Sequence, residues 1–137
     1  MNAHFVGELE LHPLPDGRNW QLAHPFGFWT PRAGLVPVPT GFKTDLASIP
    51  QLFWNILPPF GKYTEAAVIH DYLYRTHIGT RKVADQTLLA GMKVCHVPRW
   101  QRVVIYLAVR WFGGMAWRDD ARHISARNPY QHEAHHD

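Results

Sequence analysis

Four polar side chains lie among apolar residues in the segment from Ala66 to Lys93 of this chain. They are His70, Asp71, Tyr74 and Asp85. The apolar residues around the first three predict a helix. Because residues four apart lie on one face of a helix, His70 and Tyr74 would point in the same direction. Asp71 would point about 100° away, toward one edge of that face.

A second helix is expected to bring Asp85 to the same place. The segment THIGT (76–80) breaks the first helix, with Gly79 as the terminating residue, and Thr80 can cap the next helix. Such a short link predicts two antiparallel neighbouring helices. His70 and Asp85 are symmetric about a point between His77 and Ile78, inside this link, so they should face each other.

A histidine paired with a carboxylate can act as a general base. The carboxylate fixes the tautomer through one imidazole nitrogen and leaves the other nitrogen able to take a proton from water. Tyr74 could donate its hydroxyl to the same carboxylate, that of Asp85. Asp71 could bind a divalent cation that polarises a carbonyl and stabilises an oxyanion. The alternative is a buried His–Asp–Tyr network that only holds the two helices together.

The elements that would position these residues predict an α+β fold. Prolines interrupt the first 50 residues, and the short segments between them favour a small antiparallel sheet with loops, with strands between about residues 4 and 50. The expected strands are residues 5–11, residues 19–24 after a turn at 15–17, and an edge segment within 34–42.

Three helices are predicted between about residues 64 and 112. They are expected to run from the cap Thr64 to about Arg75, from Thr80 to about His96, and from Pro98 to Gly113–Gly114. Sheet and helices would form a single domain of residues 1–116. Residues 117–137 are rich in Arg and His and lack periodicity, so they are expected to form a flexible polar tail.

The third predicted helix has two distinct faces. The polar face contains Arg99, Arg102, Tyr106 and Arg110, and the other contains Trp100, Val103, Val104, Leu107 and Trp111. This pattern predicts that the apolar face packs in the core and that the arginines face solvent. The alternative is a helix face that meets a membrane surface or a partner protein.

Composition narrows the function classes. The formal charge is only +3 and no continuous run of Lys and Arg exists, so no nucleic-acid partner is expected. The single cysteine, Cys95, rules out an intrachain disulfide. The first 20 residues lack a Sec signal pattern, and no apolar stretch of about 18 residues predicts a spanning helix.

Three motif-rich stretches resemble a family of phage and prophage proteins classed as a domain of unknown function. They are VPTGFKTDLASIP (38–50), LPPFGKYTEAAVIHDYLY (57–74) and VADQTLLAGMK (83–93). The resemblance covers roughly residues 18–94. It implies a phage or prophage origin, a location in the host cytoplasm or the virion, and other phage proteins as partners.

A more local resemblance, over about residues 61–93, is to the phospholipase A2 superfamily. HDYLY is similar to its His-Asp-x-x-Tyr helix, and ADQTL is similar to its second-helix Asp segment, most of all in the form found in parvovirus capsids. The resemblance implies that His70 is the general base, that Asp71 is a calcium ligand, and that Tyr74 and Asp85 support the base. A phospholipid membrane surface would then be the partner.

The place of that superfamily's glycine-rich calcium loop holds a single glycine, Gly61. Asp45 and Ser48 could supply the missing oxygens, although Asp45 could equally cap a turn or short helix. Two hypotheses follow. One is a metal-assisted ester hydrolase, with calcium as the expected cation, that acts when a phage enters or lyses its host. The other is a non-catalytic virion component or host-interaction protein with a structural network.

Overall fold

The computed structural model describes residues 2–45 and 63–127, with residues 120–127 described by their backbone alone. Within these ranges, six short strands form two antiparallel sheets of three strands each, and three helices follow. The strands are β1 (His4–Val6), β2 (Leu11–Pro13), β3 (Trp20–Leu22), β4 (Phe26–Thr30), β5 (Gly34–Val38) and β6 (Lys43–Thr44). The sheet orders are β1-β4-β5 and β2-β3-β6, so the predicted α+β class is confirmed.

The strand predicted over residues 5–11 is divided between the two sheets. β1 pairs with β4, whereas β2 pairs with β3. Between β1 and β2 the chain bends at Gly7, whose φ of 84° is a left-handed conformation that glycine adopts at little steric cost. The prediction of one continuous strand is therefore wrong.

Two other strand predictions are confirmed. β3 returns antiparallel to β2 after a turn in which the Asp16 carboxylate accepts the backbone N–H groups of Arg18 and Asn19, both at 2.9 Å. β5 lies at the edge of its sheet, beside β4. An edge strand tolerates Pro37 because proline has no backbone N–H to donate, and an edge strand has a neighbouring strand on one side only.

The helices are α1 (Thr64–Thr76), α2 (Arg81–Val94) and α3 (Arg99–Arg127). The Thr80 hydroxyl accepts a backbone N–H of the first turn of α2, which confirms this cap. The predicted cap Thr64 is wrong, because Tyr63 occupies the N-cap position of α1 and makes no side-chain cap hydrogen bond. α1 ends at Thr76, and its C-cap is His77, with a left-handed φ of 55°, two residues before the predicted terminator Gly79.

α3 does not end at the glycine pair 113–114, as predicted, but continues to Arg127. Gly113 is a packing residue: a Cβ atom there would lie 2.5 Å from the Tyr74 hydroxyl oxygen. The predicted tail from residue 117 therefore begins inside a helix. Residues 128–137 lie outside the described part of the chain.

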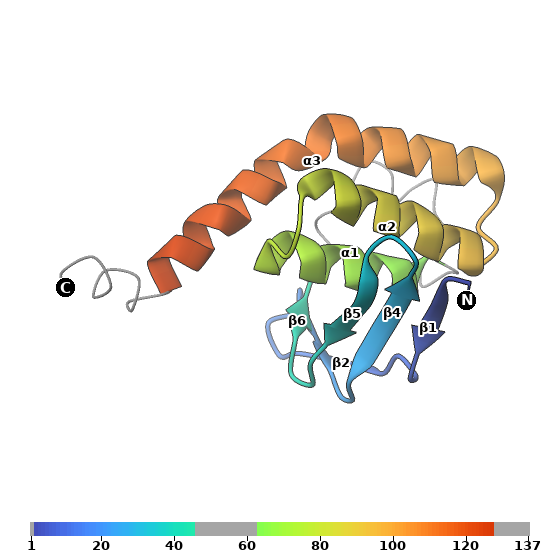
Figure 1. Cartoon of the computed structure of the whole chain (residues 1–137). Helices are drawn as coiled ribbons and strands as arrows, with labels where there is room; N and C mark the ends of the chain where they lie inside the picture. The colour runs from blue at the N-terminus through green and yellow to red at the C-terminus, as the bar shows by residue number, and fades with distance from the viewer. Residues whose placement is uncertain (1, 46–62, 128–137) are drawn as a thin grey trace, which may run out of the picture.

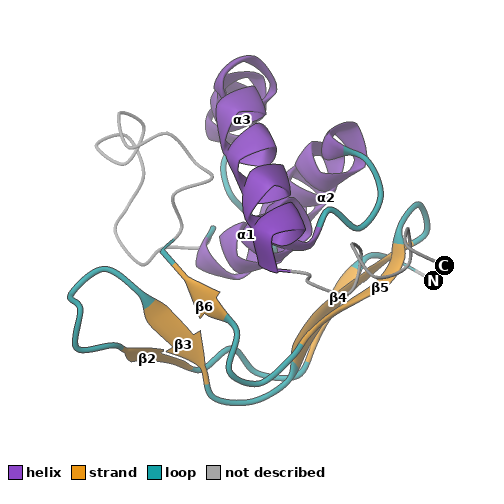
Figure 2. Cartoon of the chain, turned by 90° about the vertical axis from the view of Figure 1, so that its left-hand side faces the viewer, coloured by secondary structure: helices purple, strands orange, loops and turns teal. Residues whose placement is uncertain are grey.

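The three helices lie together on one side of both sheets (Figure 2). α1 and α2 lie between the strands and α3, which forms the outermost layer (Figure 1). Buried apolar side chains from α1 pack against those of β3, β4 and β5 on one side and those of α2 and α3 on the other. Within the described residues, no helix is long and apolar enough to cross a membrane.

The orientation of α3 is the reverse of the prediction. Its buried apolar residues are Ile105, Ala108 and Val109, none of which belongs to the predicted core face. Most of that face is exposed instead, including Trp100 and Trp111. The physical reason is that α2 presents the buried carboxylate of Asp85 to α3. A buried carboxylate requires a cationic partner, and α3 supplies Arg110.

Candidate active site

The α1–α2 pair positions the predicted histidine and carboxylate. The four-residue link 77–80 turns the chain through the left-handed His77 and restarts it at the Thr80 cap. His70 and Asp85 are both fully buried between the helices. His70 Nε2 lies 2.8 Å from Asp85 Oδ1, and the Tyr74 hydroxyl donates to the same oxygen at 2.7 Å. The predicted geometry of these three side chains is confirmed.

A third donor reaches Asp85 from α3. Arg110 Nη1 donates to Asp85 Oδ2 at 2.7 Å, and Arg81 Nη1 lies 3.7 Å from the same oxygen. Arg81 also donates to the carbonyls of Val109 and Arg110, which ties the start of α2 to α3. Sequence reasoning missed Arg110 because it placed this residue on a solvent-facing stripe. The available signal was Asp85 itself, since a buried carboxylate requires a cationic partner.

Protonation states follow from these contacts. Burial alone would raise the pKa of Asp85, but hydrogen bonds from His70, Tyr74 and Arg110 outweigh it and lower this pKa. Burial and the neighbouring carboxylate raise the pKa of Tyr74, so this phenol stays a donor. An ionised Asp85 can only accept hydrogen bonds, so Nε2 of a neutral His70 carries the proton. Nδ1 then carries the lone pair, as a general base requires.

The two predicted cation ligands, Asp71 and Asp45, lie close to each other, but both contact the guanidinium of Arg75. Asp71 is 3% exposed, and its Oδ2 accepts the Thr44 hydroxyl at 2.6 Å. Arg75 Nε lies 3.4 Å from the Asp71 carboxylate, and Arg75 Nη2 donates to Asp45 Oδ1 at 3.0 Å. Burial raises the pKa of Asp71 even though Arg75 and Thr44 oppose this rise.

This arrangement bears on the predicted calcium ion. Calcium takes six to eight oxygen ligands, and Asp71 and Asp45 already share the guanidinium of Arg75. The described residues hold no group of three or more His, Cys, Asp and Glu side chains able to bind a metal. As arranged, these side chains do not fit calcium unless Arg75 moves away. Ser48 and Gly61 lie outside the described residues, and calcium binding stays a prediction.

The candidate site falls within a region shared with other proteins. Residues 20–109 match the family described as a protein of unknown function (DUF1353). The chain is also similar to a curated protein of Sinorhizobium fredii (strain NBRC 101917 / NGR234), "Uncharacterized protein y4jT", with 41% identity over 96 residues. That match covers 69% of this chain but 29% of the relative, so the chain corresponds to less than a third of the longer protein.

The comparison with solved structures found no significant match. The family match includes Asp45, the whole α1–α2 pair and the start of α3 up to Val109. The residues His70, Asp71, Tyr74 and Asp85 all lie inside it. The chain belongs to the DUF1353 family.

Proposed function

We propose that this chain is an ester hydrolase in which His70 is the general base and Asp85 is its positioning residue. The observation that carries the proposal is the convergence of His70, Tyr74 and Arg110 on one buried carboxylate. These contacts hold Asp85 ionised, fix the His70 tautomer and direct its basic nitrogen away from Asp85. The motif resemblances supply the rest of the proposal, namely a phospholipid ester as substrate and a role when a phage enters or lyses its host.

The reaction would proceed as follows. Nδ1 of His70 takes a proton from water, and the resulting hydroxide adds to the ester carbonyl carbon. The positive charge that develops on the imidazole is stabilised by the ionised Asp85. The tetrahedral intermediate collapses, the alcohol oxygen leaves, and the imidazolium returns its proton to that oxygen. The products are an acid and an alcohol, and the histidine is regenerated.

The second candidate is a non-catalytic protein in which the same network is structural. The observation that favours it is burial: both His70 and Asp85 have no exposed surface. Within the described residues, no buried side-chain polar atom lacks a hydrogen-bond partner. A fully satisfied buried network can hold three helices together without any reaction.

A hydrolysis assay on wild type and two variants separates the candidates. The substrates are phosphatidylcholine vesicles and a soluble p-nitrophenyl ester, each with and without calcium. His70→Gln should lower the rate by about 10²–10⁴ while the fold is retained, because glutamine can still donate one hydrogen bond to Asp85. Asp85→Asn should lower the rate less, because the imidazole remains but its tautomer is no longer fixed.

The matched control is His24→Gln. The His24 side chain is 63% exposed and pairs with Glu10, and both residues are distant in sequence from the site. This variant should keep the wild-type rate. The structural candidate predicts no turnover by wild type. It also predicts that His70→Gln melts early, because an unsatisfied buried group lowers the free energy of unfolding by roughly 1–3 kcal/mol. Asp85→Asn should melt early under either candidate, because it breaks the ion pair with Arg110. No turnover by wild type, together with early melting of His70→Gln, would end the hydrolase proposal.

A further inference from the structure

The outward side of α3 carries an apolar surface with no partner among the described residues. Its members are Trp100, Val103, Leu107, Trp111 and Met115, which we call the α3 outer face. Their exposed fractions run from 44% at Leu107 to 76% at Trp111. The spacings of three or four residues place all five on one side of the helix. A stripe of this size on the surface indicates an interaction site.

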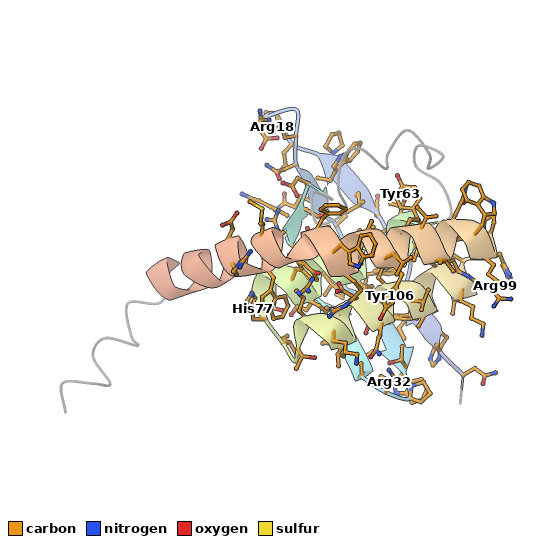
Figure 3. The ribbon with its side chains drawn as sticks, turned by 90° about the horizontal axis from the view of Figure 1, so that it is seen from above. Arg18, Arg32, Tyr63, His77, Arg99 and Tyr106 are labelled. Carbon is orange, nitrogen blue, oxygen red and sulfur yellow. The ribbon has the colours of Figure 1, made fainter. Side chains whose placement is uncertain are left out.

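Arginines border this face at both ends. Arg99 directly precedes Trp100, and both are exposed. Arg118 is exposed and follows Trp100 by five full helical turns, so it lies on the same line along the helix. Asp119 is also exposed and directly follows Arg118, about 100° around the helix from it. Figure 3 shows Arg99 at one end of α3, directed away from the body of the molecule.

The charges disfavour a parallel pair of outer faces from two copies of the chain, because Arg99 and Arg118 would each lie opposite the same residue of the other copy. In an antiparallel pair centred on Leu107, Arg99 of one copy would lie opposite Met115 of the other. Light scattering must therefore distinguish an antiparallel pair from docking on a bilayer.

We propose that the α3 outer face docks in the plane of a bilayer surface that contains anionic phospholipids. Tryptophans lie favourably at the headgroup level, with their rings facing the acyl chains and their N–H groups facing water. Arginines at both ends of the face would contact lipid phosphates. A helix that is apolar on one side and basic at its borders is suited to lie in this interface. If the chain is an ester hydrolase, docking through this face would bring it to its lipid substrate. That use of the face rests on the proposed function, whereas the docking itself does not.

Vesicle flotation with the full chain tests the docking without any turnover. The probes are vesicles of phosphatidylcholine alone and of phosphatidylcholine mixed with phosphatidylglycerol. Wild type should float with the mixed vesicles and only weakly with the neutral ones. Trp100→Ser with Trp111→Ser should lower binding by about tenfold or more, since two large apolar contacts are lost. Arg99→Gln and Arg118→Gln should each lower it about fivefold, on mixed vesicles alone.

The matched control is Leu35→Ser, which removes an exposed apolar side chain (54% exposed) from β5, on the other side of the helices. It should float like wild type, as should His70→Gln, whether or not the chain hydrolyses esters. Absence of flotation with mixed vesicles would overturn the proposal. A second result would also overturn it. If wild type is a dimer in light scattering, if Trp111→Ser is a monomer, and if wild type floats with neither kind of vesicle, the face binds a second copy of the chain.

Discussion

Asp85 and Asp71 are two buried aspartates on adjacent helices, and their replacement by asparagine should have unequal effects. In Asp85→Asn, the new amide could offer its oxygen to His70 and Tyr74, but its nitrogen would then face the donors of Arg110. Removing one partner of a buried ion pair costs about 3–5 kcal/mol, and the lower end applies because the Arg110 side chain is 28% exposed and can be rehydrated.

Asp71→Asn should cost much less. The asparagine oxygen can still accept the Thr44 hydroxyl, and Arg75 keeps its shorter contact with Asp45. The lost contact from Arg75 is 3.4 Å long, and that side chain is 33% exposed. Ion pairs of this kind contribute about 0–1 kcal/mol, so the free energy of unfolding should change by no more than this amount.

The two variants should also respond to pH with opposite signs. The pKa of Asp85 is lowered in the folded protein, so its stabilisation is present above the ordinary value of 3.8 and is lost as the pH falls through the folded-state pKa. The pKa of Asp71 is raised, so its proton stabilises the fold below 3.8 and this contribution is lost as the pH rises through the folded-state pKa.

Urea unfolding followed by circular dichroism, from neutral pH down to about pH 3, measures both differences. The deficit of Asp85→Asn relative to wild type should shrink as the pH falls. Asp71→Asn should compare best with wild type at neutral pH and become relatively less stable in acid. Two deficits with the same pH slope, or a larger deficit for Asp71→Asn at neutral pH, would refute the assigned pKa directions and the contacts from which they follow.

Two further predictions concern packing and metal binding. Gly113→Ala should destabilise the protein by about 1–3 kcal/mol in thermal melts, because its Cβ would displace the Tyr74 hydroxyl, whereas Gly114→Ala has open space and should stabilise α3 by up to about 1 kcal/mol. In calorimetry with calcium, Arg75→Gln should bind more tightly than wild type, because it frees two carboxylates from a guanidinium. Equal heats from wild type and Asp71→Asn would remove Asp71 as a ligand.

The sequence was sufficient to predict the α1–α2 pair and the contacts within it. The short link with its Thr80 cap is local information, and the symmetric spacing of His70 and Asp85 about that link follows from helix geometry alone. The edge position of β5 followed from its proline for the same reason. In each case the determining residues are close together along the chain or belong to one regular element.

The orientation of α3 could not be predicted from its own pattern. A hydrophobic stripe normally marks the buried face of a helix, and on that basis Trp100 and Trp111 belonged in the core. Which face is buried depends on a residue 25 positions earlier in the chain, because Asp85 needs the guanidinium of Arg110. Gly113 adds to this preference, since only a glycine leaves room for the Tyr74 hydroxyl at the point of contact.

The arginines also explain how one small core contains two carboxylates. Each buried aspartate has a guanidinium beside it: Arg110 for Asp85, and Arg75, which is shared with Asp45, for Asp71. The first pair is short and its carboxylate is fully satisfied, whereas the second is long and partly exposed, and the pKa directions of the two aspartates differ accordingly. A tight pair suits a residue that must stay ionised to orient a base. In the loose pair, a metal ion could replace Arg75 as the cation beside Asp71. Replacing Arg75 therefore tests whether Asp71, next to His70 in the chain, can bind a metal ion.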